Sequence, residues 1–244
     1  DRRMKLPTFE LADIIRLYKS EFIKVHSPHA SALKVLHALE KCRTAALGGH
    51  VDVCDSCSHL RISYNSCRNR HCPKCQSTNR ERWIQARKQD LLPCTYFHVV
   101  FTLPEQLNPY CIHYPGGVYD ILFAASKETV EVFSKDPKYL GAQAGMISLL
   151  HTWGQNLTLH PHVHMIVPGG GITGGGKWKK VRNQGKFLFP VKAMSIVFRG
   201  KFMQGLLRLL EDKKQPMDKI IRNKLYEKPW VVYAKRPFLG PDQV

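Results

Sequence analysis

The sequence predicts an α+β protein in which a small helical and zinc-binding module precedes a domain that mixes strands with helices. Three observations support this class. Amphipathic helical patterns open the chain, paired cysteines cluster within residues 42–75, and short β-rich runs alternate with helical patterns after residue 93. A hydrophobic content of 43% over 244 residues is enough for a real core.

The charge of the chain predicts a polyanionic partner. Lys and Arg number 37 against 19 Asp and Glu, which gives a formal net charge of +18 and a pI near 9.7. Nucleic acid is the first partner that this charge indicates, and an anionic membrane surface the second. No apolar run approaches the roughly 20 residues of a membrane span. The paired cysteine spacing indicates metal binding in a reducing cytosol, so we expect a cytoplasmic protein without a membrane partner.

Residues 1–49 are expected to form a helical pair that supports the cysteine-rich region after it. Residues 9–25 carry an apolar stripe at helical spacing, and Ser27-Pro28 is typical of the start of a second helix that runs to about Ala46. Gly48-Gly49 then ends that helix.

Residues 50–92 are expected to form a zinc-binding module that contacts DNA. The pattern C-x-x-C, fourteen residues, C-x-x-C provides two pairs of thiolates, which together complete a tetrahedral structural Zn²⁺ site. A short strand, 60–64, lies between the pairs, and a helix over 77–92 leaves the module. The four expected ligands are Cys54, Cys57, Cys72 and Cys75.

Four further residues near this module raise the question of a second zinc ion. They are Cys42, His50, Cys67 and His71. The alternative is that Cys42 is a buried helix residue and Cys67 a small packing residue. The sequence leaves both interpretations open.

Basic side chains surround the cysteine pairs and predict a DNA-facing surface. Arginines with amide side chains among them suit phosphate contacts and base edges. The alternative for any single one of them is a solvated charged face. The candidates in this module are Arg61, Arg68, Arg70, Lys74, Arg80 and Arg82.

The second domain, 93–244, is expected to alternate strands and helices. Strands are predicted at 96–103, 146–153, 162–168 and 230–234, and helices at 117–134, 191–212 and 216–227. Between them, a basic hairpin with one aromatic residue is a candidate single-strand DNA contact, and its residues are Lys177, Trp178, Lys179 and Lys180.

The histidines of this domain predict a second kind of metal site. His162 and His164 are two apart in a predicted strand, so their imidazoles point to the same face. His151 ends the preceding apolar run, and a hairpin connection would bring it alongside as a third ligand. Gln155 and His160 are weaker candidates for the third position. The alternative is polar histidines packed near a strand end.

Four motifs occur in order along the chain: Cys67-Arg-Asn-Arg-His-Cys72-Pro-Lys-Cys75-Gln76, then Tyr96-Phe-His-Val-Val-Phe-Thr-Leu-Pro104, then His151-Thr-Trp-Gly-Gln with His160-Pro-His162-Val-His164, then Trp230-Val-Val-Tyr-Ala-Lys-Arg-Pro-Phe238. In these motifs the chain resembles the rolling-circle transposases of the insertion-sequence-91 family. The resemblance implies a zinc-binding DNA module followed by a His-hydrophobe-His nuclease domain, built on a central antiparallel sheet flanked by helices.

The resemblance also implies the chemistry. Members nick one DNA strand with a tyrosine and keep the 5′ end as a phosphotyrosine, while a divalent ion polarises the scissile phosphate. Carried over to this chain, His162 and His164 hold that ion, with His151 as the third ligand. Mg²⁺ or Mn²⁺ is the implied ion, and single-stranded or hairpin DNA at transposon ends is the implied substrate.

One expected part has no match. The family's nucleophilic tyrosine lies on a helix that follows the segment matching Trp230–Val244, and no residue of 1–244 fits that motif. Tyr226 and Tyr233 are interpreted as structural. We therefore expect the chain to be truncated before the tyrosine helix, and to bind DNA and metal without cleaving. Two rivals are a non-catalytic, zinc-dependent nucleic-acid-binding protein and a metal-dependent hydrolase with a water nucleophile.

Overall fold

The computed structural model describes residues 8–182, 188–240 and 243. The chain divides into two compact units, unit 1 ending at Asp90 and unit 2 beginning at Leu91. Within the described ranges, none of the helices combines the length and apolar character needed to cross a bilayer.

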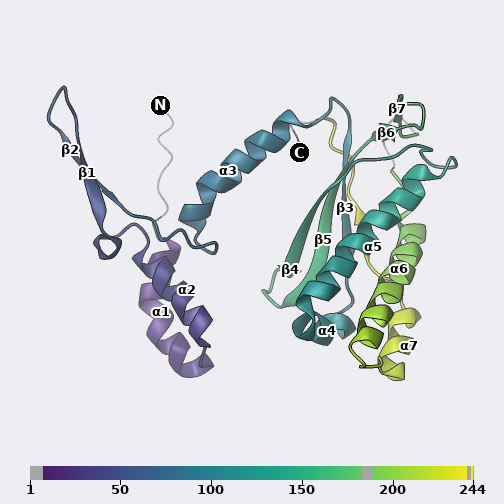
Figure 1. The fold of residues 1–244 in the computed structure, drawn as a ribbon, viewed down its shortest axis with the longest axis horizontal. Coiled ribbons are helices and arrows are strands. Elements are labelled where there is room, and N and C mark those ends of the chain that lie inside the picture. The colour runs from purple at the N-terminus through teal and green to yellow at the C-terminus, as the bar shows by residue number, and fades with distance from the viewer. Residues whose placement is uncertain (1–7, 183–187, 241–242, 244) are drawn as a thin grey trace. The chain divides into compact units, whose positions relative to one another are not determined.

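The described residues of unit 1 form three α-helices, one 3-10 turn and a β-hairpin (Figure 1). Their bounds are α1 (Leu11–His26), α2 (Ala30–Lys41), η1 (Ala45–Leu47), β1 (Gly49–Val53), β2 (Leu60–Tyr64) and α3 (Pro73–Gln89).

Local signals explain where these helices begin and end. Glu10 and Asp13 form a capping box at the start of α1, and Ser27 adopts the left-handed conformation that ends it. Pro73 occupies the first turn of α3, where a missing N–H costs nothing. The helix therefore begins four residues before the predicted start at 77.

In unit 2, the described residues form a four-stranded sheet, a small hairpin and four α-helices (Figure 1). Its elements are β3 (Tyr96–Thr102), η2 (Glu105–Leu107), α4 (Asn108–His113), α5 (Pro115–Lys135), β4 (Ile147–Trp153), β5 (Leu159–Pro168), β6 (Gly170–Ile172), β7 (Trp178–Lys180), α6 (Val191–Asp212), α7 (Lys219–Glu227) and β8 (Val232–Ala234).

The sheet is antiparallel throughout, in the order β4-β5-β3-β8. Alternate residues of β3 and β5 are buried and form one core with α5 and α6. Phe101 of β3, for example, packs against Phe198 of α6 with ring centroids 4.9 Å apart. The predicted α+β class, with an N-terminal cysteine module followed along the chain by a domain with an antiparallel sheet, is confirmed.

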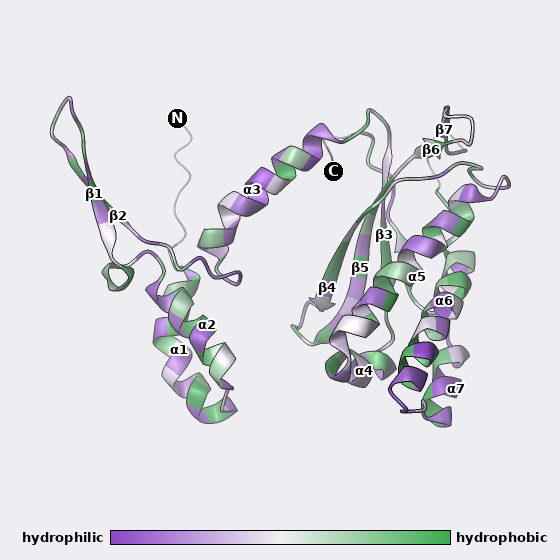
Figure 2. Cartoon of the chain, in the orientation of Figure 1, coloured by the Kyte–Doolittle hydropathy of each residue, from purple (hydrophilic) through white to green (hydrophobic). Residues whose placement is uncertain are grey.

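The other face of the sheet is more open and more polar. Its side chains include His98, His162 and His164, which are only partly buried. Figure 2 colours the strands of the sheet largely as hydrophobic, with a hydrophilic segment within β5. One face thus stabilises unit 2, and the other is free to carry a site.

Candidate metal centres

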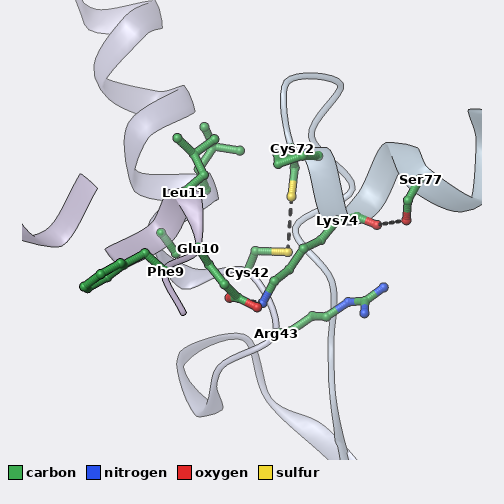
Figure 3. A pocket seen from close by; sticks show the side chains of 11 residues that line it. Phe9, Glu10, Leu11, Cys42, Arg43, Cys72, Lys74 and Ser77 are labelled. Atoms are coloured by element: carbon green, nitrogen blue, oxygen red, sulfur yellow. Dashed lines mark hydrogen bonds and ion pairs between the residues drawn. The ribbon is translucent and has the colours of Figure 1, made fainter. Parts of the chain in front are cut away.

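The first candidate centre is a cluster of four thiols in unit 1. Cys42 follows the last turn of α2, Cys72 caps α3 and Cys75 lies in the first turn of α3, while Cys67 precedes the turn between. The Sγ of Cys42 lies 3.5 Å from the Sγ atoms of Cys75 and Cys72, and those of Cys67 and Cys75 are 3.6 Å apart. All four lie within 4.8 Å of one another. Figure 3 shows the thiols of Cys42 and Cys72 pointing toward each other.

Even without a metal ion, the cluster lowers the pKa of one of its thiols, that of Cys75, and raises the pKa values of Cys42 and Cys67. Burial raises the pKa of Cys42, and it raises the pKa of Cys67 to about 12. Burial also opposes ionisation of Cys75, but hydrogen bonds from the other three thiols outweigh it and lower its pKa to about 7. Four sulfur ligands at this spacing and no open position are typical of a structural Zn²⁺ site.

The structure divides the cysteines differently from the predicted ligand set. Cys72 and Cys75 are joined by Cys42 and Cys67, whereas Cys54 and Cys57 lie elsewhere. The reason is that Cys54 and Cys57 lie in the turn of the β1–β2 hairpin. β1 pairs with β2 along five residues, so the Cys54–Cys57 turn is carried roughly 16 Å from the base of the hairpin, at about 3.3 Å per residue. The strand β2 was predicted from the sequence, whereas β1 was not.

The two histidines proposed for a second zinc ion are also outside the cluster. His50 lies on β1 with its Nε2 3.9 Å from an oxygen of Asp52. The Nε2 of His71 accepts a long hydrogen bond, 3.4 Å, from Arg70. Both histidines are exposed.

The predicted DNA-contact residues of unit 1 lie on its surface. α3 has no buried residue and carries Arg80 and Arg82. Arg61 projects from β2, Arg70 lies in the loop before α3, and neighbouring Arg68 adopts a left-handed backbone there. Lys74 differs from the others because its ammonium pairs with the carboxylate of Glu10 (Figure 3). Their contact with DNA stays a prediction.

The second candidate centre is the histidine cluster on the open face of the sheet. His151 on β4 lies directly opposite His162 on β5, and His164 follows two residues later on the same face. One ligand nitrogen of each ring lies within 4.8 Å of the other two. The structure therefore brings together the three histidines that the sequence proposed as ligands. All three are partly buried.

Hydrogen bonding fixes which nitrogen of His162 is free. Its Nδ1 lies 2.6 Å from the backbone oxygen of His160. A carbonyl only accepts, so Nδ1 carries the proton, and Nε2 keeps its lone pair for a metal ion.

A fourth histidine, which the sequence analysis did not assign, contacts the cluster. The Nε2 of His98 on β3 lies 2.7 Å from the Nδ1 of His164. The two rings are nearly coplanar, at 13°, with centroids 4.9 Å apart, as expected for edge-to-edge hydrogen bonding rather than face-to-face stacking. If Nε2 of His164 binds a metal ion, its Nδ1–H donates to His98. The available signal was a single imidazole inside the apolar run Tyr96–Leu103.

The pKa values of this cluster suit metal binding. Burial and then the neighbouring His151, His98 and His162 lower the pKa of His164 to about 4. Burial, followed by His162, lowers the pKa of His151, and burial followed by Lys235 lowers that of His98. These three imidazoles are therefore neutral near pH 7, which is the ligating form.

The cluster opens into a hollow of about 810 Å³ at the β4–β5 turn. Gln155 and His160, the weaker candidates for the third ligand, line this hollow but lie outside the three-histidine group. Trp153 lines it too, 53% exposed, with its ring nearly parallel to that of His151 at 13°.

Three remaining regions were named from the sequence. Lys177, Trp178, Lys179 and Lys180 lie on the β6–β7 hairpin and are exposed. Tyr226 packs its ring 4.8 Å from the guanidinium of Arg199, which agrees with a structural role. Tyr233 lies opposite Val100, which in turn faces His164, so it shares the histidine face of the sheet. It is 56% exposed, and its structural role stays a prediction.

Comparison with known families identifies two consecutive matches. Residues 14–103 match the family described as "Transposase zinc-binding domain", and residues 145–244 match the one described as "Putative transposase". Together the two matches include both metal-ligand clusters.

Two curated relatives are similar to this chain. The "putative transposase y4qJ" of Sinorhizobium fredii is 43% identical over 249 residues, covering 96% of this chain and 62% of the relative. The transposase for insertion sequence element IS801 of Pseudomonas savastanoi pv. phaseolicola is 34% identical over 142 residues, covering 57% and 34% respectively. The chain thus spans less than two thirds of the length of either.

Among solved structures, TrwC complexed with a 27-mer DNA comprising its recognition hairpin and cleavage site matches over 46% of this chain and 44% of that chain. The TM-score is 0.35 and the sequence identity 13%.

Proposed function

Because the chain belongs to the IS91 family of transposases, we propose that it contains the DNA-binding and metal-binding parts of a rolling-circle transposase that nicks one DNA strand. The observation that carries this proposal is the convergence of His151, His162 and His164 on the open face of the sheet. The chain spans 62% and 34% of its two relatives, so cleavage and strand transfer are proposed for the longer protein.

The histidine cluster is proposed to bind the divalent ion of the nicking site. The donor set fits, because His151 and His164 are neutral near pH 7 and His162 has its Nδ1 proton engaged by a carbonyl. Three protein ligands leave positions for a phosphate oxygen, as a catalytic site requires. When bound, Mg²⁺ or Mn²⁺ would act as a Lewis acid on the scissile phosphate.

The nucleophile is proposed to be a tyrosine of the longer protein. Its phenolate oxygen forms a bond to the scissile phosphorus, and the bond from phosphorus to the 3′ oxygen breaks. The products are a 5′-phosphotyrosine and a free 3′ hydroxyl. One phosphodiester replaces another, so the bond can be re-formed in strand transfer without an external energy source.

Single-stranded or hairpin DNA at the transposon ends is the proposed substrate. Trp153 exposes an indole beside the histidines, and stacking on such rings suits unpaired bases of any sequence. The basic surfaces of α3 and of the β6–β7 hairpin would bind phosphates. In unit 1, the Cys42, Cys67, Cys72 and Cys75 cluster is proposed to hold a structural Zn²⁺ that organises this DNA-binding module.

The test compares this chain with the protein extended to the full length of its relatives. Both are incubated with Mn²⁺ and a hairpin oligonucleotide labelled on the 3′ side of the cleavage site. The chain 1–244 should bind Mn²⁺ and DNA without cutting, and the longer protein should form a labelled covalent adduct. His162→Ala should abolish the adduct, whereas Tyr233→Phe should leave it intact.

Each rival function gives a different result. Cutting without any adduct would indicate a hydrolase that uses water. Retention of DNA binding with Mn²⁺ binding unaffected by His162→Ala would indicate a non-catalytic nucleic-acid-binding protein.

A further inference from the structure

The turn at the tip of the β1–β2 hairpin presents two thiols that the zinc cluster does not use. Cys54 and Cys57 are both exposed. The turn is closed by backbone hydrogen bonds, from Ser58 N to Cys54 O at 2.8 Å and from Cys54 N to His59 O at 3.0 Å. Its geometry is therefore set by the backbone, and the two thiols are held together at the end of the hairpin.

The turn also places a hydroxyl beside one of the thiols. The Sγ of Cys54 lies 3.1 Å from the Oγ of Ser56. Two adjacent thiolates on one tight turn can bind a single Zn²⁺ as a bidentate pair.

Among the described residues, this pair has no further ligand of its own chain beside it. Over the residues that the structure describes, only the Cys42 and His151 clusters bring three or more donor side chains within 4.8 Å. Four of the other cysteines belong to the first cluster, and of the remaining two, Cys94 is partly buried and Cys111 is buried. A tetrahedral Zn²⁺ site needs two ligands more than Cys54 and Cys57 provide.

The hairpin that carries the pair also has an uncovered apolar face. Val51 pairs with Ile62 and Val53 with Leu60, so these side chains share one face. Each is between 57% and 62% exposed. An isolated two-stranded hairpin is marginally stable, and a contiguous apolar face of this kind is typical of a protein contact.

The charge of the hairpin favours another protein over DNA as its partner. The hairpin, 49–64, has Asp52 and Asp55 against one basic residue, Arg61, so its formal charge is −1 in a chain of net charge +18. Apart from Arg61 it offers phosphates no basic side chain. It is also a place where two strongly basic chains can approach without the repulsion that their net charge produces elsewhere.

We propose that Cys54 and Cys57 form half of a second Zn²⁺ site, and that the same two residues of a second copy of this chain complete it. The apolar faces of the two hairpins pack together around a two-fold axis, which makes the contact self-complementary. The four thiolates then form a closed tetrahedral site between the copies. The contact joins two zinc-binding modules.

The test measures mass and zinc content together. Chain 1–244 carrying His151→Ala and His162→Ala, which remove the histidine site from the zinc count, is purified with excess Zn²⁺ and a non-thiol reductant, which excludes a disulfide, and is analysed by light scattering and native mass spectrometry. All variants named below carry the same two histidine changes. We expect a dimer that contains three zinc ions: one in each Cys42 cluster and one shared. The double variant Cys54→Ser/Cys57→Ser should be a monomer with one zinc ion and an unchanged circular dichroism spectrum.

Two further variants make the result specific. Val51→Lys puts a charge on the apolar face without altering a ligand, and should weaken the dimer at least 10-fold. Cys94→Ser removes a cysteine outside both sites and should leave mass and zinc content unchanged. The proposal is overturned by a monomer with two zinc ions, which would mean a site completed within one chain, by a monomer with one, or by a dimer that survives in the double variant.

Discussion

The two metal-ligand clusters of this chain differ in how far the fold around them depends on a bound metal ion. Among the described residues of unit 1, the buried core cluster consists of Ile15, Leu39, Cys42 and Cys72, and two of these belong to the candidate zinc site. In unit 2, the histidines lie on the outer face of a sheet whose other face packs a large apolar core. A metal ion in unit 1 therefore replaces a core, whereas a metal ion in unit 2 is added to a fold that already has one.

The largest expected effect on folding comes from chelating the zinc of unit 1 or removing one of its thiol ligands. Structural Zn²⁺ contributes on the order of 10–16 kcal/mol of apparent binding free energy to small domains, which is also folding free energy. Removing zinc, or changing Cys72→Ser, should unfold unit 1 while unit 2 stays folded. Hydrogen exchange, followed separately in residues 8–90 and 91–182, measures this. Protected amides in α2 and α3 after chelation would contradict it.

Loss of a histidine ligand should have the opposite pattern, with a large loss of metal binding and little change in the stability of the fold. His162→Ala is expected to weaken Mn²⁺ binding by more than about 100-fold, because it removes a ligand rather than an outer-shell partner. The stability of the metal-free chain should change by less than about 1 kcal/mol, since the side chain is only partly buried. Isothermal titration and thermal unfolding measure the two quantities.

A matched control exists in the same hollow. His160→Ala removes an imidazole that lies outside the cluster, while its backbone oxygen can still accept the Nδ1–H of His162. Equal loss of Mn²⁺ binding in both variants would show that the three-histidine assignment is wrong.

Substitution of His98 tests whether its hydrogen bond to His164 strengthens metal binding at the histidine cluster. Outer-shell partners that orient a ligating histidine typically contribute 10–100-fold to metal affinity. His98→Phe removes the acceptor for His164 Nδ1–H and should reduce Mn²⁺ affinity within that range. His98→Gln keeps an acceptor oxygen at similar reach and should restore most of it. If both variants bind Mn²⁺ equally weakly, His98 acts through packing alone.

The sequence predicted best the features that local periodicity determines. The helix at 191–212 has its predicted bounds. The strands predicted at 146–153 and 162–168 occur at Ile147–Trp153 and Leu159–Pro168. His162 and His164 could be assigned to one face because strand geometry alone decides it. His151 needed only the hairpin connection of β4 to β5.

The sequence did not predict the features that depend on pairing with a distant partner. The division of the cysteines results from β1, whose partner strand carries Cys54 and Cys57 away from Cys72. The spacing of the two C-x-x-C pairs alone does not show which cysteines share a metal site. His98 was missed because its role depends on the neighbour relation of β3 and β5, strands separated by 56 residues of chain between Thr102 and Leu159.

The smallest expected effect is on the stability of unit 2 at acid pH, and it comes from the histidine cluster. The folded chain holds the pKa of His164 at about 4, below the usual 6.5. Between these values the unfolded chain binds a proton that the folded chain does not, so this group costs stability as the pH falls from 6.5 toward 4 and nothing further below. Because the ring is only partly buried, the loss in metal-free unit 2 should be on the order of 1 kcal/mol. Denaturant unfolding at pH 7 and pH 5 of wild type and His164→Gln measures it. The variant should lack this contribution, and an equal pH dependence in both proteins would show that His164 is not held neutral by its surroundings.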